Sequence, residues 1–170
     1  FSMSHGVNRG KLKRDKVDER HNFITDLITE CPNIIFDIYG YKDREPVWAD
    51  DFYKVIVNSK MALNLTRGKP LKYLTSNRIA SLIGNGLLTF IDKKTKLDNF
   101  FNSDEVVFYS GLQDLANKIN FYKSNDKSRV RIAKNGRRKY FDLFECQKVA
   151  EYIVSKSFNR EISKKLKWMD

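Results

Sequence analysis

The sequence has little cysteine, no long apolar run and no metal-binding pattern. Among its 170 residues only Cys31 and Cys146 are cysteines, and their separation matches no metal or redox spacing. We therefore expect two reduced thiols, as is usual in cytoplasmic proteins. No stretch of about 18 consecutive apolar residues occurs, and the first residues contain no hydrophobic signal core. These absences argue against a disulfide scaffold and a membrane-spanning helix, and they predict a soluble, cytoplasmic chain.

Recognisable catalytic groups are also missing. His5 and His21 have no partners at metal-ligand spacing. Nothing resembles a Ser-His-Asp or Cys-His nucleophile pair. Asp37 has no second carboxylate at a convincing spacing for acid–base catalysis. The sequence therefore identifies no metal site and no catalytic base.

The chain is strongly basic, with 32 Lys and Arg against 21 Asp and Glu, which gives a net charge of +11. This surplus favours anionic partners such as nucleic acid, acidic lipid headgroups or phosphorylated small molecules. The basic residues cluster in 9–20, 127–139 and the last dozen positions. No arginine-glycine repeat, zinc pattern or RNA-binding aromatic signature accompanies them, so nucleic acid is the less favoured partner. A solvated helix face is the commoner meaning of such clusters.

Apolar residues make up 41% of the chain, enough for a core, and their periodicity predicts alternating helices and strands. The expected strands are 34–39, 61–65, 87–91 and 105–109. The expected helices are 17–28, 50–59, 77–84, 112–122, 129–144 and 149–158. Asp50 or Asp51 is expected to cap the second helix, and Gly136 to interrupt the fifth. This order predicts an α/β fold, a Rossmann-like parallel sheet flanked by helices on both faces.

Segment 59–92 carries the most informative pattern. A predicted strand leads into a loop with Arg67, Lys69 and Lys72, and Ser76-Asn77-Arg78 then opens a helix. The start of a helix offers unpaired backbone N–H groups and a partial positive charge. Arg67 and Lys72 suit phosphate oxygens, and Arg78 opposes the helix dipole unless an anion lies nearby. We expect a diphosphate here, and the alternative is an ordinary N-cap followed by a solvated arginine.

Two glycine-containing loops are expected beside it, because ligands of open α/β sheets bind at the carboxyl ends of strands. Segment 4–10 contains Gly6 and Arg9, and its glycines allow close backbone approach to a phosphate. A flexible terminus fits this segment equally well. The turn 84–86 places Gly86 before a strand, although Gly84 also fits a plain helix C-cap. Tyr109, at the end of a strand, either stacks on a base or belongs to the core.

In this order, the motifs resemble the C-terminal, nucleotide-sugar-binding domain of bacterial GT-B glycosyltransferases, and more narrowly the CgeB-like, group 1 family. The similarity is strongest over 60–144. The matching features are Leu63-Asn64 at a strand end, Ser76-Asn77-Arg78, Gly86 before a strand, and segments 106–109, 114–122 and 129–136.

The resemblance implies that 1–158 form the donor domain, that 159–170 form a basic tail, and that an N-terminal acceptor domain is absent from this chain. It implies transfer of a sugar from a nucleoside diphosphate sugar to a cell-surface glycan or lipid-linked acceptor at the cytoplasmic face of the inner membrane. It also implies no bound metal or cofactor, because side chains and a helix dipole stabilise the departing diphosphate. The tail either leans on anionic lipid or packs back as a final helix.

The resemblance also implies site residues. Arg67, Lys72 and Arg78 meet the diphosphate, and the loop with Gly6 and Arg9 closes over it. The other donor-site positions are Asn64, Ser76, Asn77, Ser81 and Gly86. Many relatives place a glutamate three residues after the arginine, whereas this chain has Ser81, which binds a ribose hydroxyl more weakly than a carboxylate does. A basic nucleic-acid-binding module and a non-catalytic partner domain stay open as alternatives.

Overall fold

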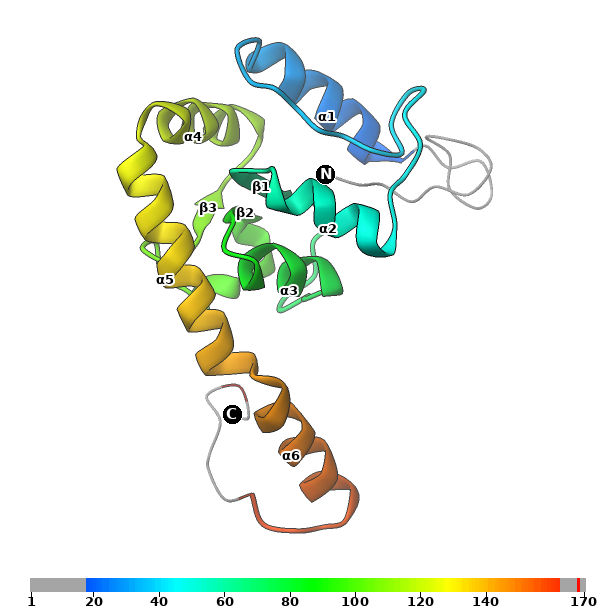
Figure 1. Ribbon diagram of the computed structural model, residues 1–170, viewed down its shortest axis with the longest axis vertical. Coiled ribbons are helices and arrows are strands. Elements are labelled where there is room, and N and C mark those ends of the chain that lie inside the picture. Colours follow the sequence, from blue (N-terminus) through cyan, green and yellow to red (C-terminus); the bar gives the residue numbers. More distant parts are fainter. Residues whose placement is uncertain (1–17, 163–167, 169–170) are drawn as a thin grey trace.

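The computed structural model describes residues 18–162 and residue 168 (Figure 1). The elements follow one another as α1 (Glu19–Glu30), α2 (Ala49–Val57), β1 (Met61–Asn64), α3 (Asn77–Gly84), β2 (Leu88–Asp92), two short 3-10 turns η2 (Lys93–Thr95) and η3 (Leu97–Asn99), β3 (Val107–Tyr109), α4 (Leu112–Ser124), α5 (Asp126–Phe144) and α6 (Cys146–Ser157).

The described strands form one parallel sheet in the order β1-β2-β3. Met61 pairs with Leu88 at one end of the first ladder, and Asn64 pairs with Ile91 at the other. Asp92 in turn pairs with Tyr109. The carboxyl ends of the strands therefore share one edge of the sheet, which is the edge where ligands of α/β proteins bind.

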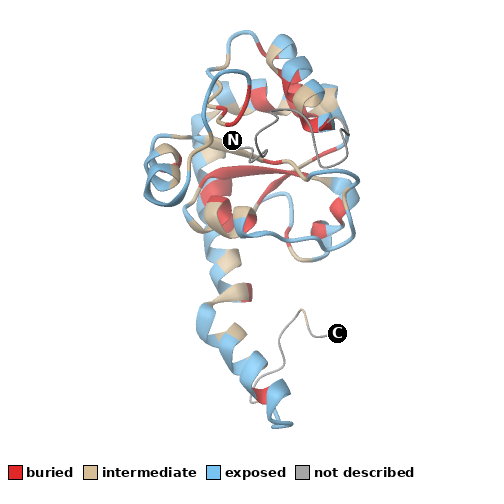
Figure 2. Ribbon diagram, turned by 90° about the vertical axis from the view of Figure 1, so that its right-hand side faces the viewer, coloured by how far each residue is buried: buried red, intermediate tan, exposed pale blue. Residues whose placement is uncertain are grey.

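Helices cover both faces of this sheet, because side chains along a strand alternate between its faces. Phe90 of β2 joins a core cluster with Leu27 of α1 and Leu115 of α4. The next residue, Ile91, joins a second cluster with Ile79 of α3 and other apolar side chains. Figure 2 shows the buried residues concentrated in the sheet and in the helices packed on it. Each fully buried side chain of this size contributes about 1.5–3 kcal/mol. The predicted Rossmann-like α/β arrangement is confirmed.

The predicted strand at 34–39 is wrong. This segment pairs with none of the three strands, and Ile35 is 94% exposed. Its apolar side chains pack elsewhere: Ile38 joins a small cluster with Ile24 of α1, with Phe36 packed against it. Within the described part of the chain, β1 is consequently an edge strand. Of residues 34–39 only Ile38 is buried, and it packs against a helix instead of pairing in the sheet.

Two local expectations also need correction. The N-cap of α2 is Trp48, and Asp50 and Asp51 lie in the first helical turn, where their charge suits the helix dipole. Gly136 does not interrupt α5, which runs unbroken from Asp126 to Phe144. A Cβ at Gly136 would lie 2.1 Å from the carbonyl oxygen of Glu105. The glycine therefore allows α5 to pass close to the backbone just before β3.

At the far end of α5, α6 extends away from the sheet (Figure 1). Trp168 packs back beside this junction: its indole N–H donates to the carbonyl of Leu143 at 2.8 Å, and its ring lies 4.8 Å from that of Tyr152. This residue of the basic tail thus packs on the protein itself. None of the helices in the described ranges combines the length and apolarity needed to cross a membrane.

Candidate functional site

A polar cavity of about 270 Å³ lies at the carboxyl end of β1. Its lining comes from α1, the end of β1, the loop that follows, and the start of α3. The lining residues are Arg20, Asn64, Thr66, Arg67, Leu74, Ser76 and Arg78. Among these described residues there are three guanidinium groups and no carboxylate. A cavity of this composition attracts anions and suits the planar, bidentate recognition of phosphate.

The strand end and the helix start fix two walls of the cavity. Asn64 is the last residue of β1, is only 5% exposed, and is held in register by its pairing with Ile91. Ser76 occupies the N-cap of α3, yet its side chain makes no capping hydrogen bond. Its hydroxyl therefore lines the cavity without being used to cap the helix. The positive end of the α3 dipole adds to the cationic character of this wall.

Arg78, in the first turn of α3, bridges two parts of the site. Its Nη1 donates to the carbonyl oxygen of Leu65 at 2.7 Å, which ties the helix start to the residue that follows β1. Burial lowers the pKa of the Arg78 guanidinium, and the positive charge of Arg20 lowers it further. Two like charges thus lie close enough to interact. An anion bound between them would stabilise both.

The loop between β1 and α3 is held by Tyr73. The Tyr73 backbone N–H donates to the carbonyl of Thr95 at 2.7 Å, and Asn99 donates to its hydroxyl. Its ring packs edge-on against Phe100, with centroids 5.2 Å apart. Gly68, with φ of 68°, provides a left-handed turn at the tip of the loop. These contacts fix one end of the loop that carries Arg67.

Of the remaining predicted site residues, those that the structure describes lie outside this cavity. Lys72 places its Nζ 4.7 Å from the centre of the Tyr73 ring. Asn77 is exposed in the first turn of α3, and half-buried Ser81 accepts a hydrogen bond at its backbone carbonyl from Asn85. Gly6 and Arg9 lie outside the described residues.

The expectation that the 84–86 turn joins the carboxyl-end loops is wrong. Gly86 precedes β2, and because the sheet is parallel this turn lies at the amino-terminal edge. Its φ of 78° serves the turn, and the position where a Cβ would stand is 3.6 Å from Cδ of Arg137. Tyr109 is 1% exposed within the core, so its ring is not available to stack on a base.

Sequence reasoning missed Arg20 and Thr66. Arg20 lies in the first turn of α1, far from the 59–92 motif in sequence, and it reads there as one more member of a basic cluster. The available signal was Asp18, the N-cap of α1, which marks the helix start and accepts a hydrogen bond from the Arg20 backbone N–H. Thr66 lies in the loop beside Arg67 and carries no charge that would single it out.

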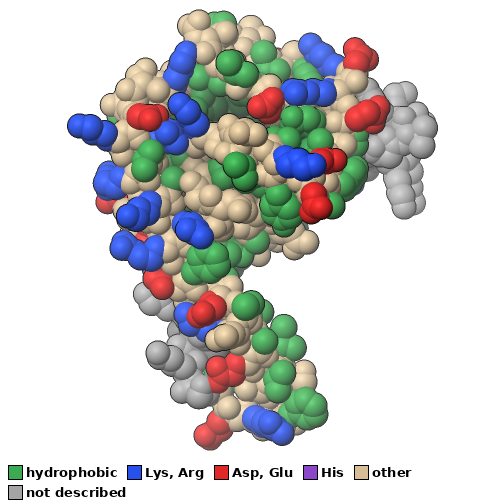
Figure 3. All heavy atoms as spheres, viewed as in Figure 1, with side chains coloured by type: hydrophobic (Ala, Val, Ile, Leu, Met, Phe, Trp, Pro, Cys, Tyr) green, Lys and Arg blue, Asp and Glu red, His purple; other side chains and the backbone are tan. Residues whose placement is uncertain are grey.

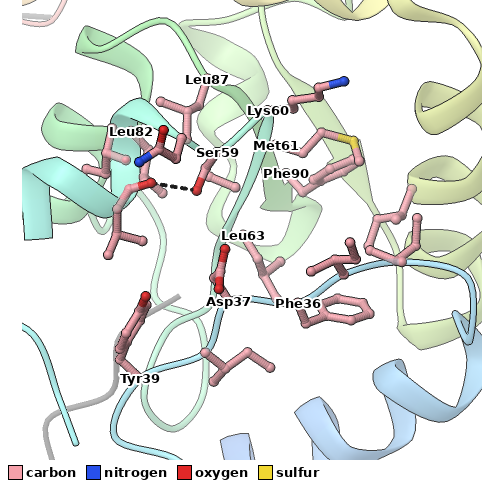
Figure 4. Close-up of a pocket in the computed structure, with 18 of the residues that line it drawn as sticks. Phe36, Asp37, Tyr39, Ser59, Lys60, Met61, Leu63, Leu82, Leu87 and Phe90 are labelled. Carbon is pink, nitrogen blue, oxygen red and sulfur yellow. Dashed lines mark hydrogen bonds between the residues drawn. The ribbon is translucent and has the colours of Figure 1, made fainter. Parts of the chain in front are cut away.

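A second, larger cavity of about 570 Å³ separates the 34–39 segment from β1 and α2. In Figure 4 the segment carrying Phe36, Asp37 and Tyr39 passes beside Leu63 of β1. The Ser59 hydroxyl on its rim donates to the Val55 carbonyl at 2.9 Å, which is the bond drawn there. The walls are mostly apolar. Arg78 lines this cavity as well as the smaller one at the carboxyl end of β1, which we call the arginine cavity because Arg20, Arg67 and Arg78 line it.

Lys and Arg side chains also gather along α5 (Figure 3). Several of them are committed to contacts within the protein. Arg129 pairs with Asp126, Arg131 pairs with Asp104, and Arg137 donates to the carbonyl of Gly84. Such contacts favour a solvated structural face over a nucleic-acid surface. Among the described residues, no group of three or more His, Cys, Asp or Glu is placed to hold a metal ion.

Comparison with known proteins identifies a family. A family model described as glycosyl transferase-like matches residues 16–155, which is most of the chain. The chain matches no curated protein and no solved structure. The matched range includes every element from α1 to α5 and all seven residues of the arginine cavity. The chain therefore belongs to the glycosyl transferase-like family, whose members transfer a sugar from a nucleotide-sugar donor to an acceptor.

Proposed function

We propose that this chain is the donor-binding domain of a GT-B glycosyltransferase and that its arginine cavity holds the diphosphate of a nucleoside diphosphate sugar. The observation that carries the proposal is the meeting of Arg67, Arg78 and the Ser76 hydroxyl at the carboxyl end of β1. Guanidinium groups bind phosphate oxygens in a bidentate manner, and the α3 terminus contributes a partial positive charge. Family membership supplies the substrate class.

In this proposal the cavity acts on the leaving group. Negative charge accumulates on the diphosphate as the bond to the sugar breaks, and cations fixed beside it stabilise that charge without reorganising. The guanidinium groups would then supply the charge that a divalent metal supplies in other enzymes, so we infer metal-independent transfer. The measurement is donor affinity in excess EDTA and in millimolar Mg²⁺, with equal values expected. A marked rise in affinity with Mg²⁺ would contradict metal independence.

The finer assignments belong to the same proposal. The donor domain is 1–158, and a second domain would hold a glycan or lipid-linked acceptor and provide the base that activates it. We place the reaction on the cytoplasmic side of a bacterial envelope, with peripheral contact between the basic 159–170 tail and anionic lipid. The +11 net charge supports attraction to such a surface.

Calorimetric titration of the chain with UDP, GDP and their sugar conjugates tests donor binding. Saturable binding is expected, and Arg78→Met is expected to weaken it by about 10- to 100-fold, since hydrogen bonds to charged groups contribute about 1.5–3 kcal/mol. Arg138→Met is the matched control, because it removes the same charge from an exposed position on α5 that lies outside the cavity. Circular dichroism of each variant checks that it is folded.

Two results would overturn the proposal. One is the absence of binding to every nucleoside diphosphate by a folded wild-type chain. The other is tight binding of DNA or RNA that falls steeply with salt and is equally strong in Arg78→Met, which would favour the nucleic-acid alternative.

A further inference from the structure

We propose that Arg20 is a third phosphate-binding residue of this cavity and that Asp18 is the residue that positions it. The inference rests on the proposed function and deepens it. It assigns to the donor site a cation from the first helix, outside the β1–α3 unit that supplies Arg67 and Arg78.

Asp18 holds Arg20 by a bidentate ion pair. The Arg20 Nε lies 3.0 and 3.2 Å from the two carboxylate oxygens, and its Nη2 lies 2.6 Å from one of them. The Arg20 backbone N–H donates to the same carboxylate at 3.1 Å. The three side-chain contacts leave this guanidinium little freedom to move. They use Nε and Nη2, so the Nη1 group remains outside the pair.

Both members of the pair are buried, with Asp18 at 1% and Arg20 at 6% exposure. A buried ion pair is weak evidence of stabilisation, because removing two charges from water offsets most of their attraction. The location of the ion pair is more informative than its contribution to stability. Arg20 forms a wall of the cavity that Arg67 and Arg78 also line, and its charge acts on Arg78. The carboxylate allows a guanidinium to remain buried beside a second cation before a ligand binds.

The charge balance indicates which anion fits. Counted over the described residues of the cavity wall and its ion pair, Arg20, Arg67 and Arg78 with Asp18 leave a surplus of two positive charges. The diphosphate of a nucleotide sugar is esterified at both ends and carries one negative charge on each phosphate group. The surplus of two positive charges therefore matches the two negative charges of such a diphosphate.

The test is calorimetric titration of the 170-residue chain with UDP-glucose, GDP-mannose, inorganic pyrophosphate and uncharged uridine. Three variants are needed: Arg20→Met, Arg20→Lys, and the double variant Asp18→Asn with Arg20→Met. The double variant keeps an N-cap residue and removes both charges, so it folds without an unpaired buried carboxylate. Arg138→Met again controls for net charge, and thermal unfolding with circular dichroism establishes that each protein is folded.

The double variant is expected to bind the preferred nucleotide sugar and pyrophosphate about 10- to 100-fold more weakly than wild type. Arg20→Lys is expected to recover part of that loss, because it restores the charge but not the planar fork. Uridine binding is expected to stay unchanged. A residue with only a structural role would not produce this separation between charged and uncharged ligands.

The results separate the two proposals. If wild type binds nucleotide sugars, Arg78→Met loses binding and the folded double variant binds as wild type does, the assignment of Arg20 is overturned and the donor site stands. If the folded wild-type chain binds neither nucleotide sugars nor pyrophosphate, both proposals are overturned. Equal losses for uridine and pyrophosphate in the double variant would overturn the electrostatic role of Arg20.

Discussion

Gly136→Ala is the substitution for which local propensity and tertiary packing give opposite answers. Gly136 lies inside α5, where alanine is favoured over glycine by about 1 kcal/mol in an unconstrained helix. In the folded protein the added Cβ would stand 2.1 Å from the Glu105 carbonyl oxygen and 3.2 Å from its carbon. The neighbouring group is backbone at the entry to β3, so it cannot turn aside as a flexible side chain can.

The size of the effect follows from that distance. Relief of the clash to 3.0 Å needs a displacement of about 0.9 Å between α5 and the chain before β3. Such a shift disturbs Ile132 and Ala133, which α5 buries in the core beside the sheet. Overpacking of this kind costs about 1–3 kcal/mol. Because the clash is with backbone, we take the upper part of that range, about 2–3 kcal/mol. After the gain of about 1 kcal/mol in helix propensity, we expect a net loss of about 1–2 kcal/mol in the free energy of unfolding.

Urea denaturation followed by far-UV circular dichroism measures this loss. With a denaturant slope of about 2 kcal/mol/M, the midpoint should fall by about 0.5–1 M. Gly84→Ala is the matched control, because Gly84 also lies in a helix and its nearest neighbour, Cδ1 of Tyr140, is 4.0 Å from the added Cβ. Its midpoint should stay equal or rise slightly. An unchanged or higher midpoint for Gly136→Ala would refute the close approach of α5 to Glu105.

Three further predictions concern the loop, the thiols and acid stability. Tyr73→Ala removes the ring contact with Phe100 and the hydrogen bond from Asn99. Trypsin should then cleave the loop after Arg67 several-fold faster, while the urea midpoint changes little. Equal cleavage rates would contradict the anchoring role of Tyr73. Burial raises the pKa of the Cys31 thiol, whereas Cys146 is exposed. Iodoacetamide should therefore modify Cys146 in the native protein and Cys31 only in urea. Mass spectrometry of tryptic peptides distinguishes the two thiols. The hydrogen bond from Lys118 lowers the pKa of Asp114 below 3.8, so this carboxylate contributes stability above about pH 4 that is lost as the pH falls through its folded pKa. Asp114→Asn should therefore flatten the pH dependence of the urea midpoint between about pH 5 and pH 3. Parallel curves for wild type and variant would contradict the assignment.

Much of the fold could be predicted from local patterns. The helical spacing of Leu112, Leu115 and Ile119 predicted α4, and the short apolar runs predicted all three strands of the sheet. The expected phosphate-binding loop also lies where the pattern placed it, between β1 and α3. These features depend on neighbours within a few residues, and such interactions are present in the sequence itself.

Two of the errors share one physical cause, which is that tertiary packing selects among partners that a local pattern cannot distinguish. The 34–39 run is apolar enough for a strand, yet Ile38 packs against α1. Gly136 is a weak helix residue in isolation, yet it lies in α5 where the backbone of Glu105 leaves no room for a side chain. The error at Gly86 is of another kind: Gly86 precedes its strand, so the predicted parallel topology already implied the edge opposite Asn64.

The sequence by itself determined an alternating α/β chain, a basic surplus and a cationic loop before a helix start. Only the tertiary structure decided which cations meet. Arg20 is 58 residues before Arg78 in the chain, but the packing of α1 beside the sheet brings both into one cavity and leaves Lys72 outside it. Electrostatic interaction depends on distance in space, and that distance is fixed by the core contacts of Leu27 and Ile24 as much as by the charged residues themselves.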